Sequence, residues 1–210
     1  MTDILVVGGG GHAKVLISVL RSMPIYRVRG YIALEDAGPL LGVPFLGNDS
    51  ILEELSQKRP QPAAALGVGQ LDRGEKREAI RTKLDRLGFP MPAIVSPSAI
   101  LRDDVEVGDG TFVGDGVVVN PSSRVGKCCI LNTRAVVEHD CSIGDLVHIA
   151  PGATLGGGVA VGDRSLIGLG ANVLNQVSIV GRTIVGAGAT VVRDIVEPGV
   201  YVGCPARKLR

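Results

Sequence analysis

The chain has 210 residues, a formal net charge of +1 at pH 7, and nearly equal numbers of basic (22) and acidic (21) residues. That balance excludes a strongly basic nucleic-acid-binding surface and an acidic tail, so we expect no nucleic-acid partner. There is no basic leader and no apolar run of membrane-spanning length, which predicts a cytoplasmic protein without membrane contact. Aromatic residues make up only 3 % and Trp is absent, which suits a thin core of Val, Ile and Ala.

Residues 1–90, before Pro90-Met91-Pro92, alternate short apolar runs with helical patterns. In chain order we expect a strand at 4–7, a helix at 13–20, a strand at 28–32, a helix from 50 to about 58, a strand at 63–68 and a helix at 75–87. Ser50 followed by Glu53 has the spacing of a capping box. Such an alternation predicts a small α/β domain with a Rossmann-like parallel sheet.

Residues 93–210 contain a repeat of six. From Leu101 to Val191, each of sixteen positions spaced six apart is Leu, Ile or Val, Gly follows half of them, and a small residue stands two places before each. A coiled β-solenoid produces this period because each flat face takes one hexapeptide, which gives about five coils if three hexapeptides form a coil. We expect the aliphatic side chains to point inward and the glycines to allow tight corners. In the tail from Glu197, Pro198 and Pro205 argue against a regular strand or helix.

A glycine-rich turn, Gly8-Gly9-Gly10-Gly11-His12-Ala13-Lys14, follows the first expected strand and opens a helix. Its G-x-G-x-x-A pattern lets backbone N–H groups and a helix N-terminus meet a phosphate. The pattern is also common in ordinary tight turns. Because a dinucleotide site needs two mononucleotide halves and only about 90 residues precede the repeat, we expect the phosphates of one nucleotide rather than NAD.

The most polar corner of the repeat contains His139 between Glu138 and Asp140, with His148 nine residues later. Flanking carboxylates can hold one imidazole tautomer and stabilise the imidazolium, which suits a general base. The alternatives are a solvated polar corner and a zinc site. A zinc site of the solenoid carbonic anhydrase type needs three histidines and the repeat has two, so we expect no metal. The glycines at 152–158 indicate either a looser corner or N–H groups that approach a ligand carbonyl.

The four cysteines lack the spacing of a metal or redox motif. Cys129 and Cys141 fall on small inward positions of the repeat. We therefore expect them to be reduced core residues, as in a cytosolic protein.

Three segments together resemble the bacterial sugar-nucleotide N-acetyltransferases. They are the Gly-Gly-Gly-Gly-His-Ala-Lys turn, the Asn-Thr-x-Ala-Val-Val-Glu-His-Asp-Cys segment at 132–141, and the Gly-Cys-Pro-Ala-Arg sequence at 203–207. These hexapeptide-repeat enzymes act in bacillosamine- and perosamine-type aminosugar synthesis and are close to the sialic acid O-acetyltransferase group. The resemblance implies a left-handed β-helix, a homotrimer, and acetyl-CoA bound in clefts between neighbouring solenoids.

The resemblance also implies roles for individual residues. His139 is similar to the family's general base and Asp140 to the carboxylate that orients it. The expected remaining site residues are Asn132, Glu138 and His148 in the catalytic pocket, Gly157 near the thioester, Leu169 and Ala187 at pantetheine and adenine positions, Arg207 near the CoA phosphates, and Gly10, Gly11 and His12 at the nucleotide phosphates. The family's acidic pair after the second strand begins here with Ala33, so Glu35 and Asp36 are the candidates for contacts to the base and ribose.

The expected activity is acetyl transfer from acetyl-CoA to the amino group of a nucleotide-linked sugar, of the 4-amino-4,6-dideoxy type, with no metal. O-acetylation of a sialic acid or related sugar and a non-catalytic solenoid scaffold remain as alternatives. A nucleotidyltransferase usually needs a larger catalytic domain than 90 residues provide. The nucleotide, UDP or GDP, and the use of longer acyl donors stay open.

Overall fold

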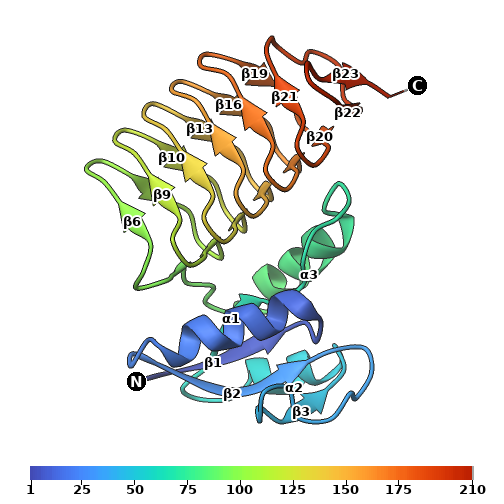
Figure 1. The fold of residues 1–210 in the computed structure, drawn as a ribbon. Helices are drawn as coiled ribbons and strands as arrows, with labels where there is room; N and C mark the ends of the chain where they lie inside the picture. The colour runs from blue at the N-terminus through green and yellow to red at the C-terminus, as the bar shows by residue number, and fades with distance from the viewer. Residues whose placement is uncertain (210) are drawn as a thin grey trace. The chain divides into compact units, whose positions relative to one another are not determined.

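The computed structural model describes residues 1–209 and divides the chain into two compact units. Unit 1 comprises residues 1–69 and 75–97, and unit 2 comprises residues 70–74 and the chain from 98 onward. Figure 1 shows the helices in unit 1 and a stack of coils in unit 2. Among the described residues, no helix combines the length and apolarity needed to cross a membrane.

Unit 1 is built around a four-stranded parallel sheet with the strand order β3-β2-β1-β4. The strands are β1 (Thr2–Val7), β2 (Tyr26–Ile32), β3 (Phe45–Gly47) and β4 (Ala63–Leu66), and the helices are α1 (Gly11–Arg21), α2 (Ile51–Ser56) and α3 (Glu75–Arg86). Alternating strands and helices predicted this parallel sheet. The three-residue edge strand β3 was not predicted, because so short a run carries no period of two.

The capping box predicted at Ser50 is wrong. Helix α2 does start directly after Ser50, but this residue has a helical backbone (φ −70°, ψ −27°) and makes no side-chain cap bond. Its hydroxyl donates instead to Asn48 Oδ1 at 2.7 Å, and its N–H donates to the same oxygen at 3.0 Å. A local side-chain turn at Asn48 has therefore replaced the expected cap.

Unit 2 contains a left-handed parallel β-helix with three flat faces. Each strand of these faces has two residues and, before the last coil, pairs in parallel with the strand 18 residues further on, as in Arg124↔Ser142, so three hexapeptides do form one coil. The β7–β19 face consists of β7 (Glu106–Val107), β10 (Arg124–Val125), β13 (Ser142–Ile143), β16 (Ala160–Val161) and β19 (Ser178–Ile179). The β8–β20 face contains β8 (Phe112–Val113), β11 (Ile130–Leu131), β14 (His148–Ile149), β17 (Leu166–Ile167) and β20 (Ile184–Val185). The β6–β21 face consists of β6 (Ile100–Leu101), β9 (Val118–Val119), β12 (Val136–Val137), β15 (Thr154–Leu155), β18 (Asn172–Val173) and β21 (Thr190–Val191). A further short strand, β5 (Ile94–Val95), precedes the coils.

The repeated aliphatic residues form the core of the β-helix, as predicted. From Val113 to Val191, all of them are at most 4 % exposed. Leu101, in the first coil, is 36 % exposed, because no earlier coil covers it. Cys129 and Cys141 are buried beside this core as free thiols, which confirms their predicted place.

The glycines after the aliphatic positions have a different role from the one predicted. The left-handed corner lies two residues further on, and residues other than glycine often occupy it, as Asp140 does (φ 59°). At Gly144, an added Cβ would lie 2.8 Å from the backbone N of Asp163, and at Gly108 it would lie 2.7 Å from the backbone of Gly126. These glycines are needed because the next coil approaches too closely for a side chain.

The tail contains regular structure that the two prolines did not predict. Strand β22 (Val200–Val202) pairs in parallel with β20, and β23 (Arg207–Lys208) pairs antiparallel with β22. Pro198 and Pro205 lie outside both strands, so neither removes a donor from the ladder.

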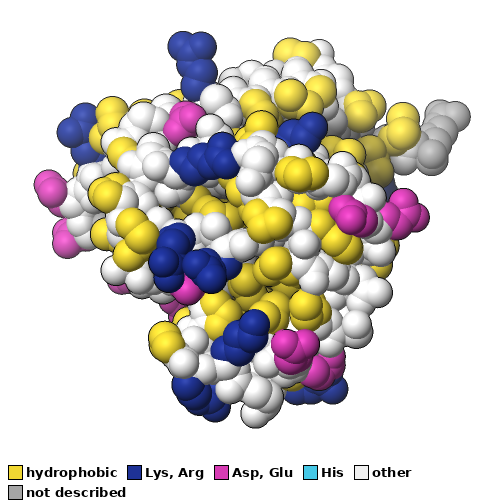
Figure 2. Space-filling model, turned by 90° about the horizontal axis from the view of Figure 1, so that it is seen from below, with side chains coloured by type: hydrophobic (Ala, Val, Ile, Leu, Met, Phe, Trp, Pro, Cys, Tyr) yellow, Lys and Arg dark blue, Asp and Glu magenta, His cyan; other side chains and the backbone are white. Residues whose placement is uncertain are grey.

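Charged side chains are spread over the face of the molecule that Figure 2 shows. Lys and Arg lie interspersed with Asp, Glu and apolar side chains on that face, and there is no large patch of one charge sign in this view. The distribution suits the near-zero net charge.

Candidate active site

A histidine–carboxylate pair projects from the corner between the β6–β21 and β7–β19 faces, which we term the His139 edge. His139 follows β12, and its side chain is 57 % exposed. Its Nδ1 lies 2.7 Å from Asp140 Oδ2. Because an ionised carboxylate can only accept a hydrogen bond, this contact places the proton on Nδ1 and leaves Nε2 with a free lone pair. The pair has the geometry of a general base with its orienting acid.

Gly157 lies one coil above His139 on the same edge. An added Cβ would lie 2.6 Å from His139 Nε2 and 2.7 Å from Cε1, so only glycine leaves room for the ring in this position. The backbone joins the two coils, since Gly158 N–H donates to the His139 carbonyl at 2.8 Å. The structure thus brings together His139, Asp140 and Gly157, three of the residues expected at the site.

Asn132 and His148 form a second cluster. His148 is 6 % exposed, and its Nδ1 lies 2.8 Å from the carbonyl of Gln70, while Asn132 Nδ2 lies 3.2 Å from its Nε2. A carbonyl only accepts, so the proton is on Nδ1 and the Asn132 amide donates to Nε2. Asn132 Oδ1 accepts from the backbone N–H of Thr133 at 2.9 Å. This arrangement makes His148 a positioning group for the Asn132 amide.

Within one protomer the two clusters lie on different edges. Asn132 stands at the corner between the β8–β20 and β6–β21 faces, which we term the Asn132 edge, and strand β12 separates it from His139. Glu138 is half-buried beside His139, and its carbonyl accepts from Ser123 Oγ at 2.8 Å. The expected single pocket of Asn132, His139 and His148 is therefore not formed by one chain alone.

Leu169 and Ala187 lie in consecutive coils of the Asn132 edge. Leu169 is 57 % exposed, and Gly188 N–H donates to its carbonyl at 2.8 Å. An added Cβ on Gly168 would lie 2.7 Å from Ala187 N, which fixes how closely the two coils approach. The two side chains present an exposed apolar strip, a surface suited to an extended apolar arm of a ligand.

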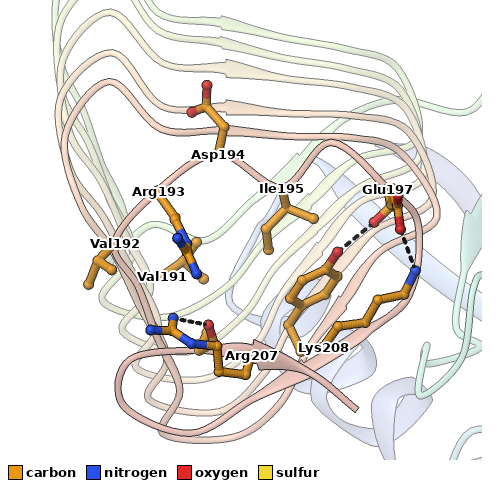
Figure 3. Close-up of a pocket in the computed structure, with 10 residues that line it drawn as sticks. Val191, Val192, Arg193, Asp194, Ile195, Glu197, Arg207 and Lys208 are labelled. Atoms are coloured by element: carbon orange, nitrogen blue, oxygen red, sulfur yellow. Dashed lines mark hydrogen bonds and ion pairs between the residues drawn. The ribbon is translucent and has the colours of Figure 1, made fainter. Parts of the chain in front are cut away.

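A pocket of about 330 Å³ lies near the C-terminus and contains Arg207 (Figure 3). Glu197 and Lys208 form an ion pair at 2.9 Å there, and the Lys208 ammonium lowers the pKa of the Glu197 carboxyl. Arg193 and Arg207 lie on the other side of the view. The pocket is lined by Val191, Val192, Arg193, Asp194, Ile195, Glu197, Tyr201, Ala206, Arg207 and Lys208.

Arg193 is a candidate anion ligand that the sequence analysis missed. It makes no ion pair with the described residues, so its guanidinium is available to an anionic ligand beside Arg207. The signal was its spacing, since Arg193 follows His139 at three intervals of 18 residues.

Unit 1 contains a pocket of about 550 Å³ at the glycine-rich turn. Gly10 is the N-cap of α1 and no side chain caps this helix, so its first N–H groups can bind an anion. The lining residues are Val7, Gly8, Gly9, Gly10, Tyr31, Ile32, Ala33, Leu34, Glu35, Ala37, Asp49, Val68, Lys76 and Ile80. Sequence reasoning missed Lys76, the only Lys or Arg in this lining, because it comes from a helix distant in sequence.

Three residues predicted for this pocket do not line it. Gly11 and His12 follow in the first turn of α1, one and two residues beyond the lining residue Gly10. Asp36 closes a turn of its own, where Oδ1 accepts the N–H of Gly38 at 2.8 Å. Of the two expected acidic substitutes for Ala33, only Glu35 lines the pocket.

The four thiols of the chain differ in predicted reactivity. Burial raises the pKa of the Cys141 thiol, and Cys128 and Cys129 are also buried, whereas Cys204 is exposed. A raised pKa reduces the thiolate fraction, and only the thiolate reacts with a disulfide reagent. We expect one thiol per native chain to react rapidly with Ellman's reagent and the others only after denaturation. A Cys204→Ser control should lack the rapid phase, and a rapid phase that persists would contradict this assignment.

Family comparison gives two matches within the chain. Residues 3–77 match the family described as PglD N-terminal domain, and residues 122–157 match the bacterial transferase hexapeptide family (six repeats). Among curated proteins, GDP-perosamine N-acetyltransferase of Escherichia coli O157:H7 is 33 % identical over 64 residues, which is 30 % of this chain. The aligned segment spans 29 % of that relative's length.

Solved structures resemble the whole chain. A histidine-to-asparagine variant of perosamine N-acetyltransferase from Caulobacter crescentus, in complex with CoA and GDP-perosamine, is 36 % identical with a TM-score of 0.93. The match covers 100 % of this chain and 98 % of that one. The acetyltransferase domain of PglB from Neisseria gonorrhoeae, in complex with acetyl coenzyme A, is 32 % identical with a TM-score of 0.90, covering 99 % of this chain and 98 % of that one.

Proposed function

Because the chain belongs to the hexapeptide-repeat sugar-nucleotide acetyltransferases, we propose that it transfers an acetyl group from acetyl-CoA to the amino group of a nucleotide-linked amino sugar. The observation that carries this proposal is the His139–Asp140 pair, whose free Nε2 faces Gly157 on an open edge of the β-helix. The pocket at Gly10 in unit 1 is suited to the nucleotide. Relatives that bind CoA and GDP-perosamine support both substrates.

The transfer is direct in this proposal. The neutral amine attacks the thioester carbonyl carbon while His139 Nε2 accepts its proton, and Asp140 stabilises the imidazolium. The new N–C bond forms, the C–S bond breaks, and the imidazolium returns the proton to the CoA thiolate. In this proposal positioning of two bound substrates contributes several kcal/mol and the base about 10²–10⁴-fold, and no metal takes part.

The two substrates meet different parts of the chain. In unit 1, N–H groups at Gly10 bind the nucleotide phosphates, and Glu35 accepts hydrogen bonds from ribose or base. In unit 2, the apolar strip at Leu169 and Ala187 contacts the pantetheine arm, and Arg207 binds a CoA phosphate. Ala33 replaces the family's first acidic residue, which leaves Glu35 as the expected acidic substitute that lines the pocket.

A homotrimer completes the site in this proposal. Within one protomer, His139 is separated from His148 and from the Leu169–Ala187 strip, because His139 lies on a different edge of the β-helix. Around a three-fold axis, the Asn132 edge of one protomer can face the His139 edge of its neighbour. Light scattering coupled to size exclusion should give three times the chain mass.

The free thiols of the buried cysteines suit a reducing cytoplasm, where acetyl-CoA is made.

A panel of UDP- and GDP-linked sugars tests the reaction class. Amino sugars, matched hydroxyl sugars and a sialic acid are each mixed with acetyl-CoA, and thiol release is followed with the Cys204→Ser protein to lower the background. Release with the amino sugars alone supports N-acetylation. Release with the hydroxyl acceptors would favour O-acetylation, and no release with any acceptor would favour a scaffold.

A further inference from the structure

Two glycines leave a gap in the His139 edge, and a carboxamide extends into it. Gly157 and Gly158 stand one coil above His139 and Asp140, and Asn175 and Gln176 follow in the next coil. An added Cβ on Gly158 would lie 2.8 Å from Cδ and 3.1 Å from Oε1 of Gln176, with Nε2 closer still. The Gln176 side chain therefore lies over Gly158 with its amide nitrogen foremost.

The backbone holds Gln176 in this place while its amide stays available. Its N–H donates to the Gly157 carbonyl at 2.9 Å, and its left-handed conformation (φ 62°) sets the direction of its Cα–Cβ bond. The Gln176 amide makes no hydrogen bond with any of the described residues, and the residue is exposed. An unengaged donor over Gly158, next to the glycine that His139 faces, is a candidate ligand for a substrate oxygen.

The neighbouring Asn175 carries the same chemical group in a different setting. Its side-chain oxygen is directed at Gly156, where an added Cβ would also lie 2.7 Å from its backbone N. This amide is therefore turned away from the Gly157–Gly158 pair. Of the two carboxamides, only that of Gln176 faces the gap that His139 Nε2 approaches from the coil below.

We propose that Gln176 is a further catalytic residue, whose Nε2–H donates to the carbonyl oxygen of the acetyl thioester. The inference depends on the proposed acetyl transfer. To lose its proton to His139 Nε2, the attacking amine must meet the acyl carbon near that nitrogen, which places the acyl oxygen over Gly157 and Gly158. The Gly157 N–H, which makes no hydrogen bond with the described residues, is a main-chain donor at this point, and the exposed Gln176 amide over Gly158 is a second donor, from a side chain. It transfers no proton and stabilises the negative charge that develops on oxygen.

Steady-state kinetics of Gln176→Ala, with Asn175→Ala as the matched control, tests the proposal. Loss of one oxyanion donor costs about 10²–10³-fold in kcat in enclosed sites, and at this open edge we expect about 10–100-fold. The KM for acetyl-CoA and the affinity for CoA should change less than about threefold, as expected for an interaction made only in the transition state. Asn175→Ala should keep kcat within about threefold of the unaltered protein.

Two further variants separate the donor from backbone strain. Gln176→Gly relieves the left-handed strain and removes the amide, so it should lose kcat as Gln176→Ala does while gaining thermal stability. Gln176→Glu places a carboxylate against the developing oxyanion and should be slower than either. A raised KM with unchanged kcat, or a kcat equal to that of Asn175→Ala, would overturn the proposal. If the unaltered protein releases no thiol with any amino sugar, the proposed function fails and this inference with it.

Discussion

His139→Ala is expected to lower kcat by about 10²–10⁴-fold, the usual contribution of a general base. Its imidazole is the group whose free Nε2 can accept the amine proton, because Asp140 engages Nδ1 at 2.7 Å. The side chain is 57 % exposed, so its removal leaves no cavity in the core and the protein should fold normally. Single-turnover acetyl transfer at saturating substrates measures the chemical step directly.

Two comparisons make the His139 result specific. CoA affinity, measured by calorimetry, should stay within about threefold of the unaltered protein, because the imidazole acts in the transition state rather than in binding. Asp140→Asn should cost less than His139→Ala, since it weakens the orientation of the ring and leaves the base in place. Near-normal turnover of His139→Ala would remove this histidine from the mechanism.

Gly157→Ala is expected to lower kcat by about 10²-fold, although only one methyl group is added, since a misplacement of about 1 Å can cost that much. The new Cβ would lie 2.6 Å from His139 Nε2, so the imidazole must swing away from its Asp140-bound position. The measurement is kcat for acetyl transfer beside a thermal melt. An upward-shifted KM with normal kcat would contradict a displaced base.

Gly152→Ala is the control for an added methyl group at a glycine of the coils. Gly152 has φ 70° and no atom within 4 Å of an added Cβ, so alanine there tests backbone strain without a clash. We expect about 1 kcal/mol of lost stability and unchanged kcat, as strain at a left-handed corner predicts. If both glycine variants lose activity equally, a general loosening of the coils explains the effect better than a moved imidazole.

The β-helix was predictable because its core repeats in sequence. Each buried aliphatic from Val113 to Val191 recurs every six residues, and this period follows directly from three flat faces per coil. The role of the glycines was not predictable in the same way. Gly144 is constrained by Asp163, which stands in the next coil, and a contact across coils has no local signature. The strands of the tail were missed for the same reason, since β22 depends on its pairing with β20.

The site could be predicted from the sequence only where its residues are neighbours in the chain. His139 and Asp140 are adjacent, so their contact could be expected from the residues alone. Gln176, Arg193 and Lys76, the further residues proposed for the site, were not predicted because their positions depend on coil stacking or helix packing. The family resemblance implied that Asn132 and His148 share one pocket with His139. In a single chain, the β6–β21 face separates these two residues from His139.

Because the coils have a constant height, residues spaced 18 apart along the His139 edge stand at regular distances from one another. Gly157, Asn175 and Arg193 follow His139 at intervals of 18 residues, and neighbouring strands lie about 4.8 Å apart, so the coil of Arg193 stands about 14 Å from that of the imidazole. A thioester carrier must reach across this length to use both ends. Truncated carriers that lack a terminal phosphate could still reach the imidazole, but they would forgo the anchoring charge at the far coil. Deleting one whole coil would shorten the distance between the imidazole and the coil of Arg193 by one coil height and keep every face in register.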